Sequence, residues 1–390
     1  MGRFAYSWRD GCDTTLLVDG DRFFPAMLAA IDAASESVVL VNYLVEPGAC
    51  LERFAAALTA AAGRGVEVYV LADRFGAYAA RDELKQLADA KVNLAWFNPA
   101  RPWPPRLNLF RDHRKLLMVD GATGFIGGFC ITDDFDPASS DQPWHDLALR
   151  LKGPVVSDMH AEFAHDWQVY AGGRPELPTT TASAGQGRCR LLRNHPLQRR
   201  EIRHRVASVV AGARHRAWIA TPYFAPSFRL LRELRRAARR GVDTRLLLSG
   251  TATDQPLVRS AGWRFYGRLL RDGVRIFEYQ ERCLHMKAQL IDDLAAVGSC
   301  NLDHWGMRWN RDAQVETTHA PAIASLQQLF TTDFAASKEI TSELYRDRSL
   351  GARLSQRFSA LIDAWLVRSA YRGQLRAYRA YRRAARRSGR

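Results

Sequence analysis

Two stretches of the sequence decide the fold: residues 113–120, HRKLLMVD, and residues 285–292, HMKAQLID. Both read His-x-Lys-x4-Asp, and they begin 172 residues apart in a chain of 390 residues. Each motif contains a short apolar run typical of a buried strand, in which side chains two positions apart share a face. We therefore expect each histidine to lie beside its lysine, where an imidazole and an ammonium meet one phosphate group.

The lysines in these motifs are unusual for this chain. Of 56 Lys and Arg residues, only 6 are lysines, and two of those are Lys115 and Lys287. Because the chain otherwise uses arginine for its cations, the motifs indicate a need for a compact ammonium. The simpler interpretation, a pair of buried structural histidines, explains neither the lysines nor the repetition.

The sequence around the motifs repeats as well. Strand-like runs end at Tyr43 and at Tyr223, 180 residues apart, and Arg-Gly-Val triplets end at Val66 and Val242, 176 residues apart. A near-constant offset with alternating strands and helices predicts an α/β fold of two duplicated α/β/α halves around one shared active site. The predicted parts are a first half at 1–170, a Gly-, Pro-, Thr- and Ser-rich linker at 171–188, a second half at 189–345 and a basic amphipathic tail at 346–390.

The composition of the chain indicates which classes of partner it can bind. The net charge of +15 and pI of 9.9 favour anionic partners: nucleic acid, phosphate-bearing metabolites or anionic lipid headgroups. The six cysteines form no CxxC pair, which predicts reduced thiols and no zinc site. With no signal-peptide pattern and no apolar run long enough to span a bilayer, we expect a protein that is not integral to the membrane; if it works on membranes, it works from the surface, on the cytoplasmic side.

Further polar residues follow each motif. Ser299 and Asn301 are candidate phosphate donors in the second half, whereas the first half has Cys130 at the place that corresponds to Asn301. Asp146 follows His113, and Asp312 follows His285, so we expect each carboxylate to hold the far nitrogen of the histidine in its own half. Asp120 and Asp292 end the motifs and are expected to order the turns that follow.

The paired motifs identify a resemblance to the phospholipase D superfamily, which is defined by two HxKxxxxD motifs. Within it, the chain is most similar to bacterial cardiolipin synthases of the short form without N-terminal transmembrane helices. The supporting segments are residues 111–117 (RDHRKLL), 221–224 (TPYF), 237–242 (AARRGV), 285–292 and 297–303 (VGSCNLD), followed by Asn310. The resemblance extends from about residue 15 to 345; Cys130, where these synthases usually have Asn, departs from it.

The resemblance implies a phosphatidyltransferase with the catalytic residues His113, Lys115, Asp120, His285, Lys287 and Asp292. It implies a covalent phosphohistidine; superfamily precedent favours His113 as the nucleophile and His285 as the acid and base, and the pseudo-symmetry of the motifs leaves the reverse assignment open. Phosphatidylglycerol would be both donor and acceptor, without a metal or other cofactor. The expected partners are anionic lipid and the membrane surface, not nucleic acid.

Two segments fit a lipid substrate. Trp103, Leu107, Leu109 and Phe110 form a possible lipid-facing lip, for which an ordinary packed loop is an equal alternative. Nine arginines after residue 367, interleaved with aromatic residues, fit an anionic membrane surface or a nucleic-acid contact. Two other functions stay open: a phospholipase D-type hydrolase, phosphodiesterase or nuclease with the same site, and an inactive membrane-binding scaffold.

Overall fold

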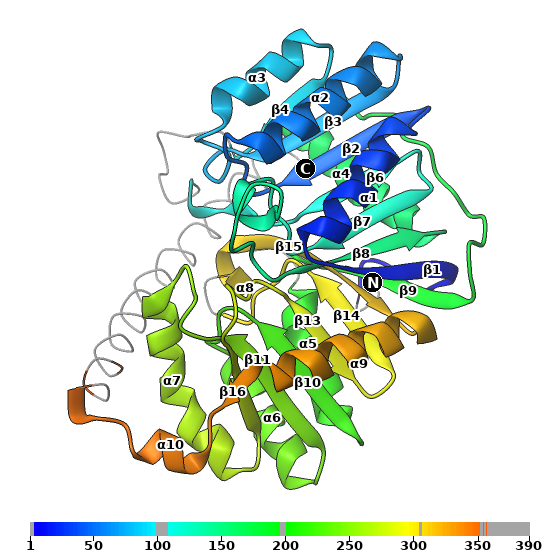
Figure 1. Ribbon diagram of the computed structural model, residues 1–390. Helices are drawn as coiled ribbons and strands as arrows, with labels where there is room; N and C mark the ends of the chain where they lie inside the picture. Colours follow the sequence, from blue (N-terminus) through cyan, green and yellow to red (C-terminus); the bar gives the residue numbers. More distant parts are fainter. Residues whose placement is uncertain are drawn as a thin grey trace, which may run out of the picture.

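A computed structural model of the chain describes residues 4–98, 108–195, 200–303, 306–351, 354 and 356. The first half lies above the second in Figure 1, and strands alternate with helices in both. The predicted α/β fold of two duplicated halves is confirmed. The basic tail beyond residue 356 and the lip residues Trp103 and Leu107 lie outside the described residues.

The first half contains eight strands, four α-helices and one short 3-10 helix among the described residues. The strands are β1 (Arg9–Val18), β2 (Ser37–Asn42), β3 (Glu67–Asp73), β4 (Asn93–Phe97), β5 (Arg111–Asp112), β6 (Leu116–Val119), β7 (Thr123–Gly127) and β8 (Leu147–Lys152). The helices are α1 (Gly20–Asp32), α2 (Ala49–Gly63), α3 (Arg81–Asp89), η2 (Asp133–Phe135) and α4 (Val155–Tyr170).

The second half repeats this order after residues 171–186, which contain no helix or strand. Its strands are β9 (Gly187–Asn194), β10 (Arg216–Thr221), β11 (Asp243–Ser249), β12 (Arg275–Tyr279), β13 (Ala288–Ile291), β14 (Leu294–Gly298), β15 (Asn310–Thr317) and β16 (Ser337–Glu339). Its helices are α5 (Glu201–Gly212), α6 (Phe228–Arg239), α7 (Pro256–Arg271), α8 (Gly306–Trp309), α9 (Ala320–Ala335) and α10 (Ser342–Arg346).

The strands pair in the same way in both halves. In the first half, β2 pairs parallel with β3 and antiparallel with β6; in the second, β10 pairs parallel with β11 and antiparallel with β13. The halves join where β1 pairs antiparallel with β9, so that the strand order runs from β16 at one edge to β4 at the other. The short strand β5 leaves this path and pairs with β15 of the second half.

The repeated Arg-Gly-Val triplets are helix ends. Gly65 after α2 and Gly241 after α6 have φ of 89° and 86°, a left-handed conformation that glycine adopts without strain. The next residue, Val66 or Val242, donates its N–H to a carbonyl five residues back and closes the last turn. The duplication visible in the sequence therefore reflects one turn geometry used twice.

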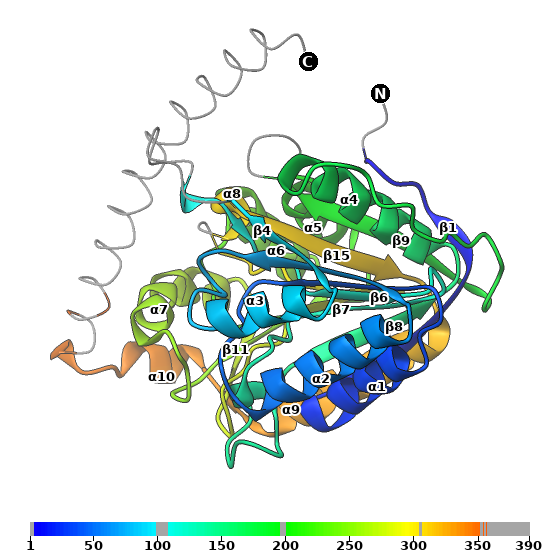
Figure 2. The same cartoon turned by 90° about the horizontal axis from the view of Figure 1, so that it is seen from above.

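The motif strands β6 and β13 lie in one hydrophobic core that extends through both halves. Leu116 and Met118 of β6 and Ala288 and Leu290 of β13 are all buried in it. Figure 2 shows α1, α2 and α9 on one side of the strands and α4 and α5 on the other. Because close-packed cores resist displacement, the residues at the start of each motif are held in fixed positions.

Candidate active site

Each motif histidine lies just before its buried strand, against the opposite half. The backbone N–H of His113 donates to the carbonyl of Arg311 in the second half (2.9 Å). The backbone N–H of His285 donates to the carbonyl of His145 in the first half (2.8 Å). Both histidines are therefore positioned by the interface between the two halves.

Both histidines line one cleft of about 590 Å³. The ring centroid of His113 is 5.0 Å from that of Tyr43, and that of His285 is 5.3 Å from that of Trp144. The other lining residues include Leu44, Cys130, Tyr223, Asp254, Leu257, Asn301, Asp303 and Asn310. The duplicated motifs thus build one site, with walls from both halves.

The carboxylates pair across the interface, which corrects the expectation that each serves its own half. His113 Nδ1 lies 3.0 Å from Asp312 Oδ1, and His285 Nδ1 lies 2.7 Å from Asp146 Oδ2. Both carboxylates are fully buried. An acceptor at Nδ1 favours the tautomer with its proton there, which leaves Nε2 with a lone pair for chemistry.

The two lysines are buried beside their histidines, with 0% of Lys115 and 5% of Lys287 exposed. Lys115 Nζ donates to the carbonyl of His113 (2.9 Å), and Lys287 Nζ donates to the carbonyl of His285 (2.5 Å). Lys287 Nζ also lies 2.9 Å from His285 Nε2. Burial lowers the pKa of both ammonium groups, that of Lys287 to about 8. Two ammonium groups thus flank the histidines.

The protein surroundings of the two histidines favour neutral imidazoles. Burial, followed by the charge of Lys115, lowers the pKa of His113 to about 4. Burial, followed by the charge of Lys287, lowers the pKa of His285 well below its usual value. A bound phosphodiester anion would raise the pKa of both histidines, because an opposite charge stabilises the protonated form.

The aspartates that end the motifs are not in the cleft, which corrects their place in the expected catalytic set. The Asp120 carboxylate accepts the backbone N–H groups of residues 35–37, directly before β2. The Asp292 carboxylate accepts those of residues 214–216, directly before β10. Each therefore fixes the entry to the neighbouring central strand instead of the turn that follows the motif.

Ser299 supports a carboxylate, contrary to its expected place as a phosphate donor. Its hydroxyl donates to Asp312 Oδ1 (2.9 Å), and its backbone N–H donates to the carbonyl of Ala313 (2.9 Å). The corresponding residue in the first half is Gly128, where an added Cβ would lie 2.4 Å from Asp146 Oδ2. Ser299 thus donates a hydroxyl to Asp312, whereas Gly128 at the corresponding position leaves space for Asp146.

Asn301 lies where a phosphate donor is expected, on the wall of the cleft. Its side-chain Oδ1 is buried and has no hydrogen-bond partner among the described residues. Cys130 lines the same cleft from the first half, and its Sγ contacts the carbonyl of Gly128 at 3.8 Å. Because a thiol donates only weakly, the second half offers the better neutral donor.

Comparison with known proteins agrees with this geometry. Residues 27–167 and 206–334 match the family model described as cardiolipin synthase, PLD-like domain. Cardiolipin synthase A of Pseudomonas entomophila (strain L48) is 34% identical over 358 residues, which cover 90% of this chain and 74% of that protein. Its counterpart from Pseudomonas putida (strain W619) is 34% identical, with 89% and 74% covered.

The chain belongs to the cardiolipin synthase family of PLD-like proteins. It is an enzyme of this phosphatidyltransferase family. The crystal structure of phosphatidylserine synthase from Haemophilus influenzae Rd KW20 shares the fold, with a TM-score of 0.69 at 14% identity and coverage of 92% of this chain and 94% of that chain. Among the described helices, none has the length and apolar character needed to cross a membrane.

The site contains two aromatic residues that the sequence did not indicate as site residues. Tyr43 and Tyr223 follow the central strands β2 and β10, and both line the cleft. The hydroxyl of Tyr223 donates to Asp254 Oδ2 (2.5 Å). Their place at the carboxyl ends of parallel strands, where α/β proteins usually bind ligands, was the available signal.

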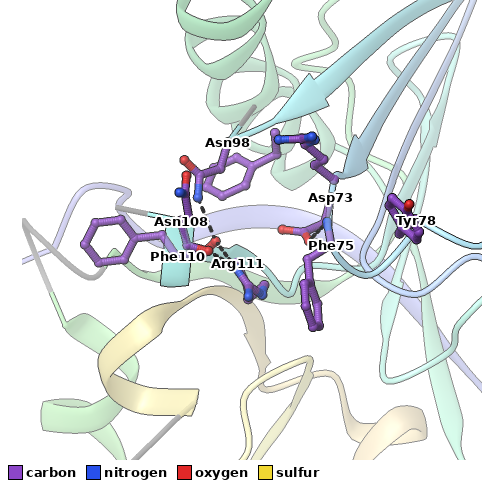
Figure 3. A pocket seen from close by; sticks show the side chains of 9 residues that line it. Asp73, Phe75, Tyr78, Asn98, Asn108, Phe110 and Arg111 are labelled. Atoms are coloured by element: carbon purple, nitrogen blue, oxygen red, sulfur yellow. Dashed lines mark hydrogen bonds between the residues drawn. The ribbon is translucent and has the colours of Figure 1, made fainter. Parts of the chain in front are cut away.

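A second cavity of about 490 Å³ lies beside β5 and is shown in Figure 3. Phe97 and Phe110 form part of its wall, and the guanidinium of Arg111 lies 4.1 Å from the ring centroid of Phe75. The buried Asp73 accepts the backbone N–H of Asp112 (2.8 Å). Asp73 thereby links the end of β3 to the residue before His113.

Of the predicted lip, Leu109 is 44% exposed, whereas Phe110 is buried.

Proposed function

We propose that this protein is a cardiolipin synthase that transfers a phosphatidyl group between two phosphatidylglycerol molecules and releases glycerol. One observation carries the proposal: two histidines share a cleft, and each Nδ1 is held by a buried carboxylate. This arrangement fits a reaction in which one imidazole attacks phosphorus while the other moves protons.

In the first step, Nε2 of His113 attacks the phosphorus of the first phosphatidylglycerol. A P–N bond forms and the P–O bond to the headgroup glycerol breaks. His285, protonated when the anionic phosphodiester is bound, gives its Nε2 proton to the departing glycerol oxygen. Asp312 stabilises the positive charge that develops on His113, because its carboxylate faces the Nδ1 proton.

In the second step, a hydroxyl of the second phosphatidylglycerol enters the cleft. His285 Nε2 removes its proton, the alkoxide oxygen attacks phosphorus, and the P–N bond breaks to restore neutral His113. The products are cardiolipin and one glycerol. Lys115, Lys287 and Asn301 are suited to hold the non-bridging oxygens as negative charge grows on them.

We propose action at the cytoplasmic surface of the bacterial membrane. Leu257 lines the cleft and is 67% exposed. An exposed apolar side chain on the wall of the cleft suits an approach to lipid. The net charge of +15 adds attraction to anionic headgroups.

The test is incubation of the purified protein with phosphatidylglycerol vesicles, followed by mass spectrometry of the products. We expect cardiolipin and free glycerol from the wild type and neither from the His113→Ala variant. Phosphatidic acid alone would indicate the hydrolase alternative. Turnover of DNA phosphodiesters without any change in lipid would overturn the proposal in favour of a nuclease.

A further inference from the structure

The dipeptides His145-Asp146 and Arg311-Asp312 make equivalent contacts with the opposite half. In each, the carbonyl of the first residue accepts the backbone N–H of a motif histidine, and the carboxylate of the second faces the ring of the same histidine. The first residue is basic in both dipeptides, and it is almost completely buried, at 3% exposed for His145 and 4% for Arg311.

The side chain of His145 joins the two halves. Its Nδ1 lies 2.8 Å from Asp19 Oδ1 before α1, and its Nε2 lies 3.1 Å from Asp333 Oδ2 on α9 of the second half. Arg282 binds the other oxygen of Asp19 (2.8 Å), and the ring of Tyr279 stacks on His145 at 5.0 Å. With two carboxylates beside it, the pKa of His145 is raised to about 10.

Asp19 also holds the residue that follows His145. Its Oδ1 accepts the backbone N–H of Asp146 (3.1 Å), and its own N–H donates to the Asp146 carbonyl (2.9 Å). Asp19 therefore contacts both the side chain of His145 and the backbone of Asp146, so it positions both residues.

Arg311 reaches the first half in the same manner. Its Nη2 donates to Asp166 Oδ1 (2.5 Å) and to Glu162 Oε1 (3.5 Å), both on α4. Asp166 also pairs with Arg114, directly after His113 (2.7 Å). In this pair, too, the cation bridges from one half to the other.

The two helix carboxylates occupy corresponding positions. Asp166 lies in FAHDW at residues 163–167 of α4, and Asp333 lies in FTTDF at residues 330–334 of α9. Each is 3% exposed or less. The duplication therefore placed one carboxylate on each helix, and each meets the cation of the opposite half.

We infer that His145 and Arg311 are positioning residues, each of which anchors the carboxylate after it on the catalytic histidine of the opposite half. Removal of the helix carboxylate leaves a buried cation with only one of its two carboxylate partners, Asp19 for His145 or Glu162 for Arg311, which is unfavourable. The cation would then move, and the attached carboxylate would lose its alignment with Nδ1. The inference rests on the proposed use of both histidines.

Two isosteric variants test it in the full-length protein, Asp333→Asn for His145 and Asp166→Asn for Arg311. Glu278→Gln is the matched control, because Glu278 is a buried carboxylate that pairs with Arg259 and makes no hydrogen bond to either dipeptide or motif histidine. The measurement is 15N NMR of the histidine side chains without substrate, which reports the tautomer of each ring.

We expect Asp333→Asn to shift His285 away from the Nδ1–H tautomer and to leave His113 unchanged. Asp166→Asn should do the reverse, and Glu278→Gln should change neither histidine. Loss of kcat of about 10-fold to 100-fold with little change in KM should accompany the shift. Asp333→Glu, which keeps a carboxylate, should restore part of the wild-type signal.

Unchanged tautomers in both asparagine variants would overturn the inference, as would an equal effect of the Glu278→Gln control. If Asp333→Asn does not fold, Asp19→Asn removes the charge of the other partner of His145 while keeping the shape of the side chain. Because the NMR readout needs no substrate, failure of the proposed lipid transfer would appear separately, as a wild type that turns over no phosphatidylglycerol.

Discussion

The two halves bring the same groups to the cleft but hold them differently. In the first half, Gly128 leaves space for Asp146, whose second oxygen accepts the N–H of Leu147 (2.7 Å). In the second half, Ser299 fills that space and donates to Asp312. The cleft wall has Cys130 in one half and Asn301 in the other. The residues on the cleft wall and the supports behind the histidines have diverged, while the histidines and lysines have not.

This difference predicts unequal tasks for the two histidines in the proposed reaction. A symmetric site would give either histidine the same support and the same access to a donor. Here the Asp312 carboxylate behind His113 accepts a hydroxyl from Ser299, whereas the Asp146 carboxylate behind His285 accepts the backbone N–H of Leu147.

The largest effect is expected from the histidines themselves. His113→Asn and His285→Asn should each reduce cardiolipin formation by at least about 10⁴-fold, as loss of a nucleophile or its base does. If His113 is the nucleophile, intact-protein mass spectrometry at neutral pH should find a phosphatidyl adduct in His285→Asn and none in His113→Asn. The opposite result would exchange their assigned roles.

Lys115→Arg and Lys287→Arg should each lose about 100-fold in kcat, because a buried ammonium site has no room for a planar guanidinium. Initial rates with phosphatidylglycerol vesicles provide the measurement. Lys152→Arg, on the exposed end of β8, is the matched control and should retain wild-type activity. Near-normal rates in either motif variant would contradict the phosphate-binding role of the lysines.

Exchange of the residues at positions 128 and 299, which lie beside the two carboxylates, should lower kcat by different amounts. Gly128→Ser places a Cβ against the Asp146 carboxylate and should lower kcat by about 10-fold to 100-fold. Ser299→Gly removes one hydrogen bond to Asp312 and should cost about 10-fold. Steady-state kinetics beside thermal unfolding separate this effect from lost stability. Wild-type activity in Gly128→Ser would show that Asp146 can move without harm.

Substitutions on the cleft wall should lower kcat by a smaller factor. Asn301→Cys should lower kcat by about 10-fold, since a hydrogen bond to a charged oxygen contributes about 1.5–3 kcal/mol. Cys130→Asn should stay within about threefold of the wild type, because the other half already supplies the donor. Kinetics of both variants check this, and equal losses would mean that the two walls contact phosphate equally.

The smallest predicted effect is a change in thermal stability with pH. The pKa of His145 is raised to about 10 by its two carboxylates, so its ion pairs stabilise the fold fully below about pH 6.5, its unfolded value, and lose this effect as pH rises towards 10. The difference in Tm between wild type and His145→Gln should therefore shrink from pH 6 to pH 10. For Arg311→Gln, which removes a permanent cation, the difference should stay constant; a parallel decrease would point to another group.

Much of the protein could be predicted from its sequence. The paired His-x-Lys motifs, their offset and the repeated Arg-Gly-Val helix ends predicted a duplicated α/β fold and its family, because these features depend on local geometry and on residue type. The sequence also predicted that each histidine lies near its lysine, but both residues precede their strand, since β6 begins at Leu116 and β13 at Ala288, so the period of a strand is not the reason. The catalytic roles of these residues stay predictions.

The partners of the histidines could not be predicted, because pairing by distance along the chain joins Asp146 with His113 and Asp312 with His285. In the tertiary structure, β5 pairs with β15 and Leu284 bridges to His145, so the start of each motif crosses to the opposite half. The sequence determined which groups the site contains and that it contains them twice. Only the packing of one half against the other decided which carboxylate orients which imidazole, since these contacts join residues 139 and 199 positions apart.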